Sequence, residues 1–208
     1  KPRVVWVMVP NGAPLDEVIL GKDGLTQVLE RGDILIDGGN SYFKDTQTRY
    51  TKLAKTGIRF IDAGVSGGPA GARNGACIMV GGSEKLFKEL EPLFADLSVP
   101  EGYAHFEGPG AGHFVKMVHN GIEYGMMQAL AEGFAVLKKS PYKINLTRAA
   151  VIYNHRSVIE SRLVEWLGRA YKEHGEELGK MSGAAAATGE GEWTVKTAQQ
   201  FKVPTPVI

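Results

Sequence analysis

The chain has 208 residues, which is long enough for one large or two small domains with a proper hydrophobic core. Its 24 Lys and Arg residues nearly balance 23 Asp and Glu residues, which excludes a strong overall field toward nucleic acid or an acidic membrane. No apolar run of about 18 residues appears, and the amino terminus enters a strand-like segment directly, so we expect a cytoplasmic protein without a membrane span or signal peptide. The single cysteine, Cys77, fits a reducing compartment and is predicted to be a small buried strand residue.

The first half of the chain alternates between short apolar runs and helix-like stretches. The patterns predict strands at 3–9, 34–37, 58–62 and 77–80, and helices at 14–31, 45–56 and 83–95, the last with Ser83 as its N-cap. This alternation predicts βα crossovers and a mainly parallel sheet, in which ligands bind outside the carboxyl ends of the strands. The loops of interest are therefore 9–12, 36–41 and 64–72.

From about residue 110 the pattern becomes helical. The segment HFVKMVHNGIEYGMMQALAEGFAVLKKS, residues 113–140, keeps a helical period, and further helices are predicted at 144–154 and 156–174. The glycine- and alanine-rich stretch 181–193 is predicted to be a loop. The sequence thus predicts an α/β domain over residues 1–110, followed by an all-α domain over residues 111–208.

Five polar side chains share one face of the long predicted helix, at positions i, i+3, i+4, i+7 and i+8: Lys116, His119, Asn120, Glu123 and Tyr124. The opposite side is predicted to seat the helix in a core through Val115, Val118, Ile122, Met126 and Ala129. A solvated polar face is the ordinary explanation for such a helix. The mixture of His, Asn and Tyr with one acid and one base, instead of repeated Glu–Lys pairs, favours a chemical site.

Lys116 and Glu123 are the candidate proton-transfer groups on this face. A lysine acts as a general base only when its amine is neutral, which desolvation or nearby positive charge favours. The two residues are two helical turns apart, about 10 Å along the axis, so their long side chains can reach a ligand of several carbons from two ends.

Two glycine-containing loops are candidates for ligand binding. Ser66, Gly67 and Gly68 could hold a carboxylate or hydroxyl group through a side-chain hydroxyl and backbone amides, or could simply form a tight loop. Asn40, in IDGGNS, either projects into the ligand crevice or serves as an ordinary turn residue. No G-x-G-x-x-G follows an opening strand, so that motif does not identify a dinucleotide site here.

Three stretches carry a resemblance to a known family: IDGGNSYFKDT, DAGVSGGPAGARNGACIMVGG and GPGAGHFVKMVHNGIEYGMMQ. They resemble the decarboxylating 6-phosphogluconate dehydrogenases over most of residues 3–208, and the spacing is more similar to the shorter bacterial branch. The resemblance implies a partial Rossmann-like domain before a helical substrate and dimerisation domain. It also implies oxidative decarboxylation of 6-phosphogluconate to ribulose 5-phosphate in the pentose phosphate pathway, with NADP or NAD as hydride acceptor and no metal.

The resemblance further implies a role for each candidate residue. Lys116 matches the general base that takes the proton of the substrate's 3-hydroxyl, and Glu123 matches the acid that protonates the enediol. Residues that match the substrate site are Ser66, Gly67 and Gly68 at the carboxylate end, His119 and Asn120 beside them, Tyr124 at the phosphate, and Asn40. Residues that match the cofactor site are Val9, Pro10, Asn11 and again Asn40.

Three departures from the family pattern limit these expectations. The family's first strands and glycine turn would precede Lys1, a phosphate-binding arginine would follow Ile208, and Thr188 stands where the long form has a lysine. We therefore expect the chain alone to bind cofactor poorly and to be inactive, and the choice between NAD and NADP cannot be read. The competing interpretations are a 3-hydroxyisobutyrate-type β-hydroxyacid dehydrogenase, which shares the SGG loop and the lysine, and a non-catalytic assembly module.

Overall fold

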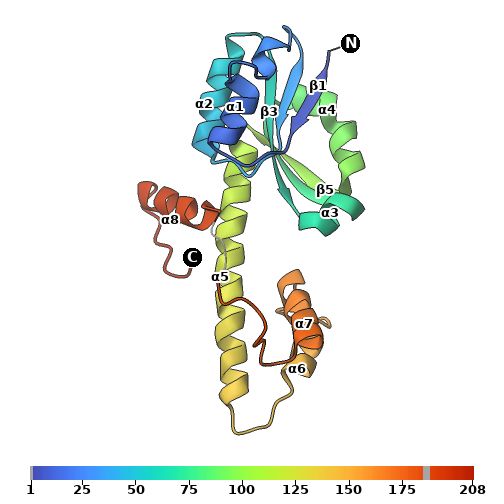
Figure 1. Cartoon of the computed structure of the whole chain (residues 1–208), viewed down its shortest axis with the longest axis vertical. Helices are drawn as coiled ribbons and strands as arrows, with labels where there is room; N and C mark the ends of the chain where they lie inside the picture. The colour runs from blue at the N-terminus through green and yellow to red at the C-terminus, as the bar shows by residue number, and fades with distance from the viewer. Residues whose placement is uncertain (1, 185–187) are drawn as a thin grey trace. The chain divides into compact units, whose positions relative to one another are not determined.

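The computed structural model describes residues 2–184 and 188–208 (Figure 1). The chain divides into two compact units, Lys1–His119 and Asn120–Ile208. No helix in the described ranges is long and apolar enough to cross a membrane.

The first unit contains a five-stranded sheet in the order β1-β2-β3-β4-β5. Its strands are β1 (Val4–Val7), β2 (Ile34–Asp37), β3 (Arg59–Ser66), β4 (Ala76–Gly82) and β5 (Ser98–Glu107). Pairing is parallel except between β3 and β4, which confirms the predicted mainly parallel sheet. Strand β5 was not predicted, because SVPEGYAHFE contains no fully buried residue and therefore no apolar run.

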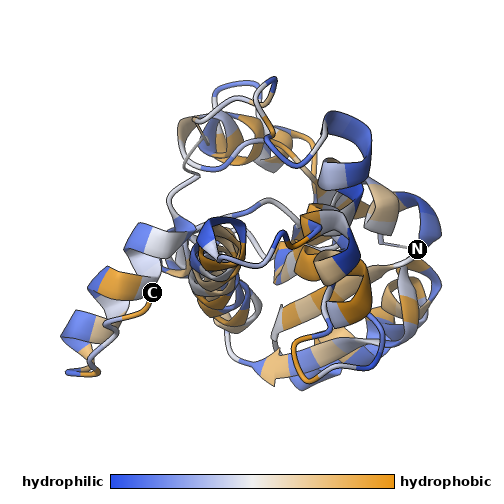
Figure 2. Ribbon diagram, turned by 90° about the horizontal axis from the view of Figure 1, so that it is seen from below, coloured by the Kyte–Doolittle hydropathy of each residue, from blue (hydrophilic) through white to orange (hydrophobic). Residues whose placement is uncertain are grey.

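Helices cover both faces of this sheet and bury its alternate residues. They are α1 (Ala13–Leu20), the short 3-10 helix η1 (Leu25–Gln27), α2 (Phe43–Ala54), α3 (Gly68–Asn74) and α4 (Glu84–Leu97). Leu35 packs with residues of α1 and α2, whereas its neighbours Ile34 and Ile36 pack with α4. Figure 2, coloured by hydropathy, shows hydrophobic residues in orange on parts of the sheet and on helix faces. The side chain of Ser83 accepts a hydrogen bond from the Leu86 amide, so the predicted N-cap is confirmed.

Several predicted boundaries in this unit were wrong. The helix predicted over 14–31 ends at Leu20, because Gly21 has an extended backbone that cannot continue it. A Cβ at Gly21 would lie 2.4 Å from the Glu17 carbonyl oxygen, so this helix end requires a glycine. Helix α3 occupies part of the predicted loop 64–72 and extends beyond it. Cys77 lies in β4 as predicted but is exposed, at the point where the register between β4 and β5 is interrupted.

The second unit is helical. The long helix α5 (Ala111–Lys139) continues into it from the first unit, followed by α6 (Leu146–Tyr153), α7 (Arg162–His174) and α8 (Glu190–Gln200). Helix α7 begins later than predicted, where the side chain of Ser161 caps the amide of Val164. The loop prediction for 181–193 is wrong from Glu190 onward, where α8 begins, and its residues 185–187 lie outside the described residues.

The predicted apolar seat of α5 is wrong from Ile122 onward, whereas Val115 and Val118 are half-buried. Ile122 and Met126 are 50% and 43% exposed. Close contacts are made instead by glycines: a Cβ at Gly121 would lie 2.7 Å from Thr194 Cγ2, and one at Gly125 would lie 3.4 Å from the Val207 carbonyl oxygen. Within the second unit the helix therefore approaches its neighbours through small residues, which bring backbones closer than large apolar side chains allow.

A buried carboxylate fixes the start of α5. Asp62, in the middle of β3, accepts hydrogen bonds from the backbone amides of Gly110 at 2.7 Å and His113 at 2.8 Å. It thereby satisfies two of the amides that lack a partner within the first turn of a helix and places a negative group at the positive end of the helix dipole. Burial raises the pKa of Asp62, while His113 and the two amides oppose that rise.

Glycines make this close approach possible. A Cβ at Gly112 would lie 2.3 Å from the Met79 carbonyl oxygen, and one at Gly81 would lie 2.2 Å from the Gly112 nitrogen. The first turn of α5 is thus pressed directly onto the backbone of β4.

Replacing Gly112 with alanine tests this close contact. Because the added methyl meets backbone and not a flexible side chain, Gly112→Ala should lower the free energy of unfolding by about 1–3 kcal/mol in urea denaturation followed by circular dichroism. Gly133→Ala, in the same helix with nothing within 4 Å of its added Cβ, is the matched control and should stabilise by up to about 1 kcal/mol. Equal effects of the two substitutions would contradict the close contact at Gly112.

Replacing Asp62 with asparagine tests the carboxylate. An amide can accept from only one of the two backbone donors, so Asp62→Asn should cost about 1–3 kcal/mol of stability near pH 7. Since burial raises the Asp62 pKa above 3.8, the folded state binds the Asp62 proton more tightly than the unfolded state does. Urea denaturation over a pH series should therefore show the wild type gaining stability relative to the variant as the pH falls toward 3.8; a constant difference would contradict the raised pKa.

Candidate active site

The loops singled out from the sequence lie at one edge of the sheet. Strands β1, β2 and β3 run parallel, so the residues that follow them meet at their carboxyl ends. Val9–Asn11 follow β1, Asn40 lies in the turn after β2, and Ser66 ends β3. This is the edge at which ligands bind in open α/β sheets.

Three predicted site residues come together in the first unit. Lys116 Nζ lies 3.4 Å from His119 Nδ1, and His119 Nε2 lies 3.3 Å from Ser66 Oγ. A protonated lysine can only donate, so Nδ1 then acts as acceptor and the ring proton on Nε2 points toward the serine. The arrangement connects the amine, through an imidazole, to a hydroxyl at the end of β3.

Lys116 is held in this place by its stem. The residue is only 7% exposed, and a Cβ at Gly64 would lie 2.4 Å from Lys116 Cβ. Since the Cβ is the fixed part of the side chain, Gly64 determines how closely α5 can approach β3. The ordinary explanation, a solvated polar face, does not describe this part of the helix.

The backbone conformation after Ser66 explains why positions 67 and 68 are glycines. Gly67 has φ 128° and Gly68 has φ 57°, both in the region that favours glycine, and a Cβ at Gly67 would lie 2.9 Å from Gly71 Cα. The tight-loop explanation therefore accounts for both glycines, and a ligand role for them stays a prediction.

The loops after β1 and β2 are joined by hydrogen bonds. The side-chain amide of Asn11 donates to the Asn40 carbonyl oxygen at 2.8 Å. The buried carboxylate of Asp37 accepts from the Gly39 amide at 3.1 Å and from the Ser41 hydroxyl at 3.0 Å. The two loops predicted to contact the cofactor thus form one ordered rim at the carboxyl ends of adjacent parallel strands.

The remaining predicted residues belong to the second unit, farther along the same helix. Asn120 and Glu123 are partly buried, and Tyr124 is 40% exposed. The Tyr124 ring lies against the start of α8, where a Cβ at Gly191 would be 3.1 Å from it. Thr188, which stands where the long form of the family has a lysine, donates a hydrogen bond to the buried carboxylate of Glu190 at 2.5 Å.

Sequence reasoning missed the residues that orient the site. Asp62, Gly64 and His113 are buried; Asp62 and His113 lie in a predicted strand and a predicted helix, and Gly64 opens the predicted loop 64–72, where its contact with Lys116 was not foreseen. The one available signal was the acid in RFIDAG, since a carboxylate within an apolar strand needs hydrogen-bond donors when it is buried.

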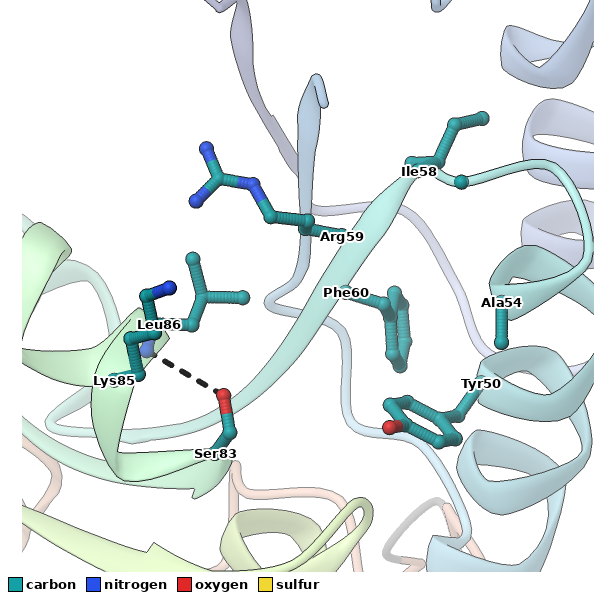
Figure 3. A pocket seen from close by; sticks show the side chains of 9 residues that line it. Tyr50, Ala54, Ile58, Arg59, Phe60, Ser83, Lys85 and Leu86 are labelled. Carbon is teal, nitrogen blue, oxygen red and sulfur yellow. Dashed lines mark hydrogen bonds between the residues drawn. The ribbon is translucent and has the colours of Figure 1, made fainter. Parts of the chain in front are cut away.

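A separate hollow of about 330 Å³ lies near the other end of β3 (Figure 3). Phe60 points toward Tyr50 and Ala54 of α2, and the start of α4 closes the opposite side with Ser83, Lys85 and Leu86. It includes none of the predicted site residues. Among the described residues, no group of three or more His, Cys, Asp or Glu residues could hold a metal ion.

Comparison with known proteins places these features in a family. Residues 1–104 match the NAD binding domain of 6-phosphogluconate dehydrogenase, and residues 112–208 match the 6-phosphogluconate dehydrogenase C-terminal domain. A putative 6-phosphogluconate dehydrogenase of Bacillus subtilis is 45% identical over 100% of this chain and 68% of its own length. An NAD(+)-dependent, decarboxylating 6-phosphogluconate dehydrogenase of Haloferax volcanii is 40% identical over 98% of this chain and 67% of its own length.

A solved structure agrees with the sequence comparisons. The 6-phosphogluconate dehydrogenase of Plasmodium falciparum, studied in its apo form and in complexes with NADP+ and with 6-phosphogluconate, superposes with a TM-score of 0.87 at 30% identity. The match covers 100% of this chain and 46% of that one. The chain thus spans about two thirds of the two sequence relatives and less than half of the structural one. By sequence and by fold, the chain belongs to the 6-phosphogluconate dehydrogenase family.

Proposed function

We propose that the protein catalyses the oxidative decarboxylation of 6-phosphogluconate to ribulose 5-phosphate, with hydride transfer to NAD or NADP. The observation that carries the proposal is the buried Lys116, whose amine lies beside His119 and, through it, Ser66, at the ligand-binding edge of the sheet. Membership of the family supports the choice of substrate and reaction.

In the first step Lys116 acts as general base. Its neutral amine takes the proton of the substrate's 3-hydroxyl while the hydride leaves C3, so that C3 becomes a carbonyl. His119, 3.4 Å from the amine, orients Lys116 and accepts a hydrogen bond from it when it is protonated. The bound nicotinamide supplies the hydride-accepting chemistry.

In the second step the carbon dioxide leaves. The C1–C2 bond breaks, and its electron pair moves toward the C3 carbonyl, which Lys116 protonates to give an enediol. Glu123 then delivers a proton to the carbon that lost the carboxylate, while the again neutral amine of Lys116 takes back the proton of the C3 hydroxyl, so that the enediol becomes the ketone. Lys116 and Glu123 are seven residues apart on α5, about 10 Å along the axis, which suits separate proton transfers at neighbouring carbons by two long side chains.

Binding of the substrate's two ends is assigned to separate groups. We assign the carboxylate end to Ser66, Gly67, Gly68 and Asn120, and the phosphate end to Tyr124. The Ser66 hydroxyl, bonded to His119, is already directed into the site, which supports its part of the assignment.

The cofactor is assigned to the rim formed by Val9, Pro10, Asn11 and Asn40. The residues fit such a group, because Asn11 and Asn40 are tied together and the rim lies at the carboxyl ends of adjacent parallel strands. A cytoplasmic location, homo-oligomerisation through the helical domain and inactivity of the chain alone stay predictions from the sequence.

Two substitutions in the full-length protein test the division of proton transfers. Lys116→Met should abolish hydride transfer with a loss of about 10²–10⁴-fold, whereas Glu123→Gln should mainly slow the later protonation. Stopped-flow absorbance at the reduced nicotinamide band separates the two, because Glu123→Gln should retain the hydride-transfer burst. Small and equal losses from both substitutions would favour the assembly-module alternative, in which the helix serves association.

A comparison of two substrates tests whether the protein is a 6-phosphogluconate dehydrogenase or a 3-hydroxyisobutyrate-type dehydrogenase. Because Tyr124 is assigned to the phosphate and Glu123 to a protonation that follows decarboxylation, kcat/KM should be far higher with 6-phosphogluconate than with 3-hydroxyisobutyrate. Spectrophotometric assays of each substrate with NAD and with NADP measure kcat/KM for both substrates and show which cofactor is preferred. Turnover of 3-hydroxyisobutyrate without turnover of 6-phosphogluconate would establish the alternative.

A further inference from the structure

Arg49 is a buried charge that the proposed reaction does not use. It lies on α2, is only 2% exposed, and its Nε donates to Asp16 Oδ1 at 2.7 Å. One terminal nitrogen lies 3.6 Å from Asp37 Oδ2, close enough for ionic attraction but too far for a hydrogen bond. Among the described residues, neither terminal nitrogen has a hydrogen-bond acceptor. The guanidinium is thus held between two carboxylates from different elements.

Asp37 links Arg49 to the turn after β2, because it lies beside the guanidinium and accepts hydrogen bonds from that turn. The carboxylate is fully buried, and it accepts the Gly39 amide at 3.1 Å and the Ser41 hydroxyl at 3.0 Å. Asn40 lies between these two residues, and its carbonyl oxygen accepts from the Asn11 side chain at 2.8 Å. A buried carboxylate is stable only when it is paired and hydrogen-bonded, so Arg49 supplies the counter-charge that keeps this turn formed.

Asp16 connects Arg49 to the other loop. It belongs to the first turn of α1, which directly follows the loop containing Val9, Pro10 and Asn11. Arg49 therefore interacts with one carboxylate next to each of the two loops that form the rim. A guanidinium suits this task, because it can donate from Nε to Asp16 while its delocalised charge extends to a terminal nitrogen 3.6 Å from Asp37, whereas a lysine ammonium is a single point charge.

We propose that Arg49 is a positioning residue that fixes the Asn11–Asn40 rim for the nicotinamide cofactor through Asp16 and Asp37. The inference rests on the proposed function insofar as the rim binds NAD or NADP. The ordering of the rim itself does not depend on that function.

Hydrogen exchange of the cofactor-free protein tests the ordering. Arg49→Lys keeps the charge but cannot reach both carboxylates, so the Gly39 amide should exchange roughly tenfold faster than in the wild type. Ser41→Ala, which removes one bond to Asp37 without touching the ion pair, should act in the same direction. Arg59→Lys is the matched control, because Arg59 pairs with Glu89 at the opposite end of β3, and it should leave Gly39 unchanged.

Cofactor affinity tests whether the rim ordered by Arg49 binds the nicotinamide cofactor. Fluorescence titration with NADH and with NADPH should show the dissociation constant of Arg49→Lys raised roughly tenfold for the cofactor that the wild type prefers, with Arg59→Lys unchanged. Steady-state kinetics should show the same rise in KM for that cofactor and a smaller change in kcat. If Arg49→Lys does not fold, Asp16→Asn, at the exposed partner, takes its place with a smaller effect of the same sign.

The outcomes separate the inference from the proposed function. Unchanged Gly39 exchange, or faster exchange with unchanged affinity, would overturn the positioning role. If the full-length wild type, in which all these variants are made, binds neither cofactor, the proposed function fails, and the exchange measurement alone decides whether Arg49 orders the rim.

Discussion

The structure of the site depends on one hydrogen-bonded carboxylate. Asp62 holds the first turn of α5 against the sheet by accepting two backbone amides, and the position of every later residue of the helix follows from that start. Since a helix advances about 1.5 Å per residue, Lys116 and His119 arrive beside Gly64 and Ser66 because the helix begins where it does. A side chain that touches no ligand thus determines where the amine lies.

Small residues and buried charges have different roles in the rest of the site. Gly64, Gly81 and Gly112 let α5 approach the strands more closely than any side chain would permit. Charged pairs then fix the loops at the edge of the sheet, as the Arg49–Asp37 pair does for the turn after β2. Glycines bring the backbones of helix and strand together, and the charges select one conformation of the loops. The polar groups of the proposed site, such as Lys116 and Ser66, are consequently held in place by the packing and hydrogen bonds around them.

The sequence predicted the features that have a local cause. Strand β2 and the extent of α5 follow from hydrophobic periodicity, and Ser66, Lys116 and His119 were expected in one site. The features with a non-local cause were missed: β5 forms by pairing and not by burial, and α5 is seated by glycines although Ile122 and Met126 fit an apolar stripe. Cys77 is exposed through an interrupted register that no local pattern reveals.

The hydrogen bond between Asp62 and the Gly110 amide joins residues 48 positions apart. Closing so long a segment of chain costs conformational entropy, so this bond must be supported by the packing around it. The anchor of the first turn of α5 therefore depends on β3 being in place in the sheet, and the position of the Lys116 amine depends on that anchor. Placement of the amine is in this sense a property of the tertiary structure, which the intrinsic helicity of residues 111–139 does not produce alone.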